Sequence, residues 1–268
     1  QGGIIIMVVQ HNLTAMNANR NLSTVTGAQQ KSTEKLSSGY RINRAADDAA
    51  GLSISEKLRS QIRGLDKAAS NSQDGISLVQ VAEGALNETH SILQRMNELA
   101  TQAANDTNTS TDRESIQQEM DQLTSEIDRI RSTTQFNSMN LLDGTFTGMR
   151  LQVGALSGQS ISISIGNMNA ATLKVSGLRV SSFSAAGKAM TAIQSAINKV
   201  STERSKLGAL QNRLEHTINN LNTTSENTSA AESRIRDVDM ATEMVEYSKN
   251  NILAQANQAN QGVLSLLG

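Results

Sequence analysis

Few residues of this 268-residue chain could do chemistry, and their spacing favours no reaction. Cysteine is absent, which excludes a thiolate nucleophile, a disulfide and a thiolate-bound metal. The three histidines, His11, His90 and His216, lie far apart in the sequence and form no pair at metal-ligand spacing. The sequence contains no H-E-x-x-H, G-x-S-x-G or G-x-x-x-x-G-K-[ST] motif. We therefore predict that the chain is not an enzyme and that it uses no cofactor and no catalytic metal.

Two adjacent carboxylates, Asp47 and Asp48, are the remaining candidates for acid–base or metal chemistry. Acidic side chains are also favoured in turns and at helix starts, where they meet the positive end of the helix dipole. We interpret the pair as belonging to a turn or a helix start.

Charge and composition limit the partners of the chain. The formal net charge is −1, aromatic residues make up 2% of the sequence, and there is no proline. Nucleic-acid binding needs clustered Lys and Arg to neutralise phosphates, and no such block is present. No stretch approaches the roughly 20 apolar residues of a membrane span. Residues 1–7 lack the features of a signal peptide, and we treat them as a candidate upstream extension or scar, with Met7 as the candidate start.

Heptad spacing predicts the elements that must position any functional residue. A row of apolar residues at steps of seven is typical of a coiled-coil helix, and it comprises Ile193, Val200, Leu207, Leu214 and Leu221. Similar stripes occupy residues 78–103 and 116–130. Between these two stripes, residues 105–110 form a polar break, and Thr111-x-x-Glu114 matches a capping box. The fold class that we predict is mainly α, with long antiparallel helices forming coiled-coil rods.

The middle of the chain, near residues 139–183, predicts the only β structure. Residues 151–153 and 161–165 alternate apolar and polar side chains, as half-buried strands do. Residues 154–159 would then form the loop of a β-hairpin. Residues 173–175 and 178–180 fit either a further short strand or a loop.

Both ends of the chain carry helical apolar stripes that neither end could bury alone. Short amphipathic helices are stable mainly through packing against partners, so we expect these stripes to pack against each other or against further copies. The candidate self-assembly core consists of Leu13, Met16, Val25, Leu36, Val238, Val245, Ile252, Ala256, Val263 and Leu266.

Long ordered motifs occur in both halves of the chain. They are KLSSGYRIN (35–43), DDAAG (47–51), NSQDGIS (71–77), EGALNE (83–88), LQR and ELA (93–95 and 98–100), TQFN (134–137), AESRIRDVD (231–239) and QANQ (255–258). Such long motifs are far more specific than a single short pattern. In these motifs the sequence resembles bacterial flagellin, over about residues 8–145 and 185–268.

The resemblance implies a short flagellin without a large variable outer domain. Residues 8–44 and 234–268 would form the inner-core coiled coil, and residues 45–233 a helical rod with the β-hairpin. The implied function is that of a structural subunit which self-assembles into the flagellar filament for motility. The implied route is type III export, which would make the chain secreted and part of the extracellular bacterial flagellum. The implied partners are an export chaperone on the C-terminal helix and the filament cap and hook-junction proteins.

The resemblance also implies recognition of the monomer by the host Toll-like receptor 5, an innate immune receptor. In similar flagellins the receptor binds a Gln-Arg-x-x-Glu-Leu motif and a Glu on the following helix. These positions match Gln94, Arg95, Glu98, Leu99 and Glu119. Asn97 departs from activating relatives, which often carry a second basic residue there.

Two other functions fit part of the sequence. A hook–filament junction protein or a minor filament subunit would share the terminal coiled coil. A signalling coiled-coil rod would share the heptads and the low aromatic content, but it would not account for the β segment or for the two terminal stripes.

Overall fold

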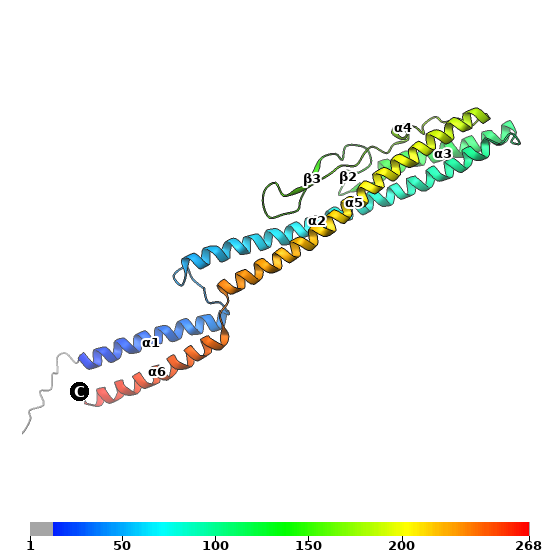
Figure 1. Cartoon of the computed structure of the whole chain (residues 1–268). Coiled ribbons are helices and arrows are strands. Elements are labelled where there is room, and N and C mark those ends of the chain that lie inside the picture. Colours follow the sequence, from blue (N-terminus) through cyan, green and yellow to red (C-terminus); the bar gives the residue numbers. More distant parts are fainter. Residues whose placement is uncertain (1–12, 268) are drawn as a thin grey trace, which may run out of the picture. The chain divides into compact units, whose positions relative to one another are not determined.

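The computed structural model describes residues 13–267, with side chains except at residues 14, 15 and 260–267. The candidate extension over residues 1–7 therefore lies outside the described residues. The elements are helices α1 (Leu13–Ser38), α2 (Ala49–Ala103) and α3 (Ser110–Thr133), strands β1 (Gln135–Phe136), β2 (Met139–Asn140), β3 (Met149–Gln152) and β4 (Ser160–Ile163), and helices α4 (Ala170–Leu173), α5 (Phe183–Arg236) and α6 (Met240–Leu267) (Figure 1). The predicted fold class, mainly α with long helices and little β structure, is confirmed.

The chain divides into two compact units. The terminal unit combines the chain through residue 60 with the chain from residue 227, and the middle unit consists of residues 61–226. Helices α2 and α5 each contribute residues to both units.

In the terminal unit, α1 and α6 lie side by side (Figure 1). The Lys35 Nζ lies 3.3 Å from the Glu243 Oε2, which joins the two helices. The segments that follow α1 and precede α6 pair as a single antiparallel β-bridge between Tyr40 and Asp237. The Arg236 guanidinium stacks over the Tyr40 ring, with Cζ 4.9 Å from the ring centroid. The segment after α1 and the segment before α6 are thus joined to each other where α1 ends and α6 begins.

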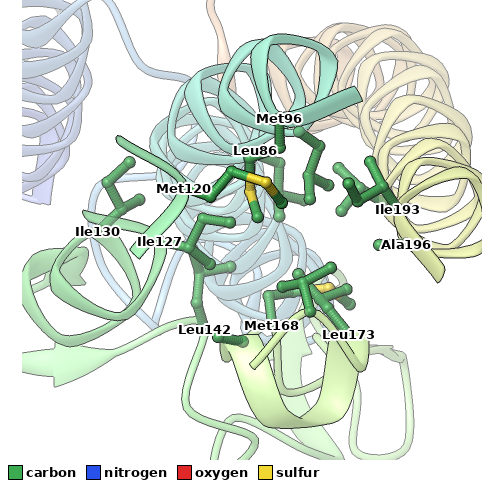
Figure 2. Packing of buried hydrophobic residues seen from close by; sticks show 14 of the residues in the cluster. Leu86, Met96, Met120, Ile127, Ile130, Leu142, Met168, Leu173, Ile193 and Ala196 are labelled. Carbon is green, nitrogen blue, oxygen red and sulfur yellow. The ribbon is translucent and has the colours of Figure 1, made fainter. Parts of the chain in front are cut away.

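The middle unit is built on the predicted heptad row. All five of its members, from Ile193 to Leu221, are buried. Ile193, Val200 and Leu207 pack with the stripes of α2 and α3 into the main core of this unit, which side chains from the β region cover on one side. Leu214 and Leu221 pack against α2 in two smaller clusters, with Ile76 and with Leu65 respectively. Figure 2 shows this packing with Leu86 and Met96 from α2, Met120, Ile127 and Ile130 from α3, Leu142, Met168 and Leu173 from the β region and α4, and Ile193 and Ala196 from α5.

The start of α3 differs from the sequence prediction. The N-cap is Thr109, whose side chain accepts a hydrogen bond from the backbone N–H of Asp112, while the Asp112 side chain accepts from the backbone N–H of Thr109. The capping box predicted at Thr111 and Glu114 is therefore wrong by two residues. The Arg113 Nε donates to the carbonyl of Ala103 at 3.1 Å, which ties the start of α3 to the end of α2.

The described residues contain two small antiparallel pairs, β1–β2 and β3–β4. The first pair begins at Gln135, outside residues 139–183, so the prediction that those residues hold the only β structure is wrong. In the second pair Leu151 lies opposite Ile161, so the predicted hairpin is confirmed. Residues 173–175, which fitted either a strand or a loop in the sequence, lie at the end of α4. This helix is capped by Lys174, whose φ of 61° is left-handed. The side chain of Asn169 caps this short helix by accepting from the Thr172 N–H at 2.6 Å.

Candidate functional site

The acidic pair Asp47 and Asp48 has a structural role. The Asp47 Oδ2 accepts hydrogen bonds from the backbone N–H groups of Arg44 and Asn43, and these bonds, that of Arg44 first, lower the pKa of Asp47. The Asp48 Oδ1 accepts from the Gly51 N–H at 2.8 Å, just inside the start of α2. The interpretation of the pair as a turn and a helix start is confirmed. Within residues 13–267, no cluster of three or more His, Asp or Glu side chains could hold a metal ion.

No helix in the described part of the chain is both long enough and apolar enough to cross a membrane.

The surface around Arg95 is an ion-pair cluster on two helices. The Arg95 Nε donates to Glu119 Oε1 at 2.9 Å, across from α2 to α3. The Arg95 Nη1 donates to Glu98 Oε2 at 3.2 Å within α2. The hydrogen bond that Arg95 donates to Glu119, followed by the one that it donates to Glu98, raises the pKa of Arg95. The Arg95 side chain is nevertheless 51% exposed. The guanidinium is thus held in place by two carboxylates and still faces solvent, and exposed pairs of this kind add little to stability.

Gln94 and Leu99, the other two residues predicted on α2 for receptor binding, differ in their exposure to solvent. Gln94 is exposed, and its amide Nε2 lies 3.1 Å from the Nε2 of His90. Leu99 is only 2% exposed and packs into the core of the middle unit. The structure therefore brings Gln94, Arg95, Glu98 and Glu119 together on the surface, while Leu99 points away from solvent.

The candidate self-assembly residues leave large apolar side chains uncovered on α1 and α6. Leu13 and Val245 are each 70% exposed, and Ile252 is 67% exposed. Met16 and Ala256 are also exposed, whereas Val25, Leu36 and Val238 are half-buried. Val263 and Leu266 lie outside the residues whose side chains are described.

The face of α6 that packs against α1 is not its apolar face. Among the α6 residues whose side chains are described, Glu243 forms the ion pair with α1, and Asn250 and Ala254 are buried. Val245 and Ile252 lie seven residues apart and, at 100° per residue, on the opposite side of the helix. They line a shallow groove of 400 Å³ together with Met244, Ser248 and Lys249. Sequence reasoning missed Met240, Met244 and Leu253, which are also large, apolar and exposed.

A second feature missed from the sequence is a set of side chains that hold the backbone after β4. The Gln117 side chain accepts from the Val180 N–H and donates to the Leu178 carbonyl. The Asp128 Oδ1 accepts from the Ala170 N–H at 3.0 Å. The buried Glu203 accepts from the Gly166 N–H at 3.0 Å through its Oε1. Residues 166–180 are therefore fixed by helices α3 and α5 through long-range contacts that no local pattern encodes.

The chain is similar to known proteins over most of its length. The family model described as "Bacterial flagellin N-terminal helical region" matches residues 9–147, and the one described as "Bacterial flagellin C-terminal helical region" matches residues 190–267. The chain is 54% identical to a flagellin of Halalkalibacterium halodurans over 97% of this chain and 100% of the relative. It is 51% identical to a flagellin of Bacillus subtilis with the same coverages. The crystal structure of Bacillus cereus flagellin aligns with 61% of this chain and 94% of its own, at 34% identity and a TM-score of 0.50.

Proposed function

The chain belongs to the bacterial flagellin family and is a structural subunit of the flagellar filament, and from this premise we propose that the outer faces of α1 and α6 make the contacts between copies. The observation that supports this proposal is the placement of Val245 and Ile252 on the side of α6 away from α1. Burying one such side chain is worth about 1.5–3 kcal/mol. In a lone subunit these side chains stay exposed to water, so this free energy of burial is gained only on assembly.

Seeded assembly tests this proposal. Monomers obtained by heating are cooled with filament seeds, pelleted and imaged by negative-stain electron microscopy. We expect Ile252→Asp to remain in the supernatant because a charge would have to be desolvated in the contact. Gln258→Asp places the same charge at an exposed polar position about 120° around the helix from Ile252 and should assemble. Equal assembly of the two variants would refute the assignment of this face.

The segment 234–268 is also proposed to bind an export chaperone before the chain leaves the cell by type III export. An exposed amphipathic helix needs such cover, because its apolar face would otherwise associate too early. Deleting residues 234–268 should abolish both chaperone binding and assembly. Retention of either activity by the truncated chain would show that this segment does not serve both roles. The filament cap and hook-junction proteins are the expected partners at the two ends of the growing filament.

The surface formed by Gln94, Arg95, Glu98 and Glu119 is proposed as the site for Toll-like receptor 5 on the monomer. What supports it is an exposed arginine held by two carboxylates, because a pre-positioned Arg is frequent among residues that dominate binding energy. Leu99 is buried, so it would contribute indirectly, by anchoring α2 in the core of the middle unit. The same face would pack between subunits in the filament, so the receptor would bind monomers.

Binding of the receptor ectodomain to monomers, measured by surface plasmon resonance, tests this site. Arg95→Ala should weaken binding about tenfold or more. Arg129→Ala is the matched control, because Arg129 is an exposed arginine of the same unit that pairs with Glu126 three residues away. An unchanged dissociation constant for Arg95→Ala would remove the assignment while leaving the filament role intact.

A further inference from the structure

Charge is strongly segregated along the middle unit. Residues 144–202 contain no Asp or Glu, yet they hold five cations, Arg150, Lys174, Arg179, Lys188 and Lys199. The rest of the chain has 19 Lys and Arg against 25 Asp and Glu. Residues 83–128 hold ten of those carboxylates and only two Lys or Arg. A nearly neutral chain therefore carries one basic and one acidic region within a single compact unit.

Three of the five cations surround one groove. A cavity of 540 Å³ lies where α4 ends against α5, and its lining includes Lys174, Lys188 and Lys199 with the hydroxyls of Thr191 and Ser195. Lys199 Nζ donates to the Thr172 carbonyl at 3.0 Å, which fixes one wall of the groove. Lys174 and Lys188 are exposed, and neither has an ion pair within the described residues. The groove thus presents two uncompensated ammonium groups to whatever enters it.

The acidic region carries a complementary row on α3. Glu114, Asp121 and Asp128 follow one another at steps of seven, so they lie along one side of the helix. That side is away from the buried stripe of α3 that includes Ile116 and Met120. Within the described residues neither Glu114 nor Asp121 has an ion pair, and the Asp121 carboxylate accepts a hydrogen bond from the Gln117 amide. Asp128, at the end of this row, accepts a hydrogen bond from Ala170, the first residue of α4. The last residue of α4 lines the groove that contains Lys174, Lys188 and Lys199, which we call the lysine groove. The acidic row therefore ends near this groove.

We propose that the lysine groove of one subunit receives the acidic row of a second copy, with Lys174 and Lys188 facing Glu114 and Asp121. Charge complementarity favours this occupant, because both halves of the contact are present on every chain and neither is neutralised within it. The contact joins two different surfaces, so it is heterologous and can repeat without closing, as a filament requires. The inference rests on the role of the chain as a filament subunit and identifies a contact distinct from the apolar faces of α1 and α6.

Charge reversal in elongation assays tests the contact. The groove variant is Lys174→Glu with Lys188→Glu, and both positions lack an internal partner. The control variant is Arg63→Glu with Lys67→Glu, which changes the net charge equally at two cations of the same unit that have no ion pair within the described residues. The complementary variant adds Glu114→Lys and Asp121→Lys to the groove variant, which restores the net charge of the original chain. Lys199 and Asp128 are left unchanged because they hold α4.

We expect the critical concentration for elongation on seeds of the original chain to rise about tenfold for the groove variant, which corresponds to about 1.4 kcal/mol of contact free energy. The control should stay within about twofold, and the complementary variant should polymerise with its own kind almost as well as the original chain. The defect should shrink between about 20 mM and about 500 mM NaCl, because salt screens exposed charges. Circular dichroism verifies folding, and Lys174→Gln with Lys188→Gln replaces any groove variant that loses helicity.

Two results would overturn the proposal. One is a groove variant that elongates like the control, and the other is a complementary variant that remains as defective as the groove variant. If the groove variant loses retention on a heparin column while it elongates normally, the groove binds a sulfated polysaccharide and not a second copy. Elongation of the unmodified chain on the same seeds reports on the filament role separately, so failure of the contact and failure of that role are distinguishable.

Discussion

A single added methyl group at Gly64 should loosen the attachment of the β3–β4 hairpin. Gly64 lies inside α2, and a Cβ built there would be 2.9 Å from the Cβ of Ala155 and 3.3 Å from its Cα. Carbon atoms pack best at about 3.5–4.0 Å, so the loop that contains Ala155 would have to move. Because the obstructing atoms belong to the backbone and a Cβ, no rotamer change can relieve the contact.

The size of the effect follows from two opposing terms. Replacing Gly by Ala inside a helix stabilises it by about 1 kcal/mol. Overpacking of a close contact typically costs about 1–3 kcal/mol. Gly84 lies in the same helix, and a methyl group added there would meet no atom within 4 Å. The difference between Gly84→Ala and Gly64→Ala therefore isolates the cost of the contact, which we expect to be about 1–3 kcal/mol.

Urea unfolding of the full chain, followed by circular dichroism, measures this difference. Gly84→Ala should raise the midpoint, and Gly64→Ala should lower it or leave it unchanged. Ala155→Gly in the Gly64→Ala background removes the opposing methyl and should recover most of the loss. The reasoning fails if Gly64→Ala stabilises the chain as much as Gly84→Ala does, because the loop then does not approach α2 as closely as the structure shows.

Three further changes test other contacts. Glu203→Ala leaves the Gly166 N–H without its acceptor and should cost about 1–3 kcal/mol in urea unfolding, whereas Glu203→Gln keeps an acceptor and should cost less; equal losses would contradict the role of this bond. Thr109→Ala should cost about 0.5–2 kcal/mol by removing the cap of α3, and Thr111→Ala should not, so a reversed order would restore the sequence prediction. The pKa of Asp239 is lowered, first by the Thr242 N–H and then by its hydroxyl. Its stabilisation of the start of α6 is therefore present above the ordinary Asp pKa of about 3.9 and is lost as pH falls through the lowered folded-state value. The protection of the Thr242 amide from exchange, relative to the intrinsic rate at each pH, should fall there, and Asp239→Asn should remove this fall in protection.

Periodic burial was predictable from the sequence because it depends on local spacing. The heptad row from Ile193 to Leu221 is buried as predicted, since a helix places every seventh residue on nearly the same side. The start of α3 was not predictable by the same means. Thr109-x-x-Asp112 and Thr111-x-x-Glu114 both fit a capping box, and the choice between them involves the contact of Arg113 with the end of α2.

The candidate receptor surface was predictable only in part. Arg95 and Glu119 belong to different helices, and their contact depends on how α2 and α3 align. The motif also places Leu99 four residues from Arg95, close to the border between the exposed and the buried side of α2. The apolar stripe of α2 already included this position, and in the structure Leu99 belongs to that stripe. The backbone contacts of Gln117, Asp128 and Glu203 left no local trace, because each joins residues far apart in the sequence.

The pairing of α1 with α6 also determines the order in which the chain can fold. Lys35 and Glu243 are separated by 208 residues, whereas Arg95 and Glu119 are separated by 24. Closing the longer loop costs about 2 kcal/mol more in chain entropy, and contacts between residues so distant in sequence form slowly. The α2–α3 contact can form while the chain is still emerging, but the pairing of α1 with α6 has to wait until α6 has followed. The terminal unit is therefore the last part of the subunit to become structured, whichever compartment the chain emerges into.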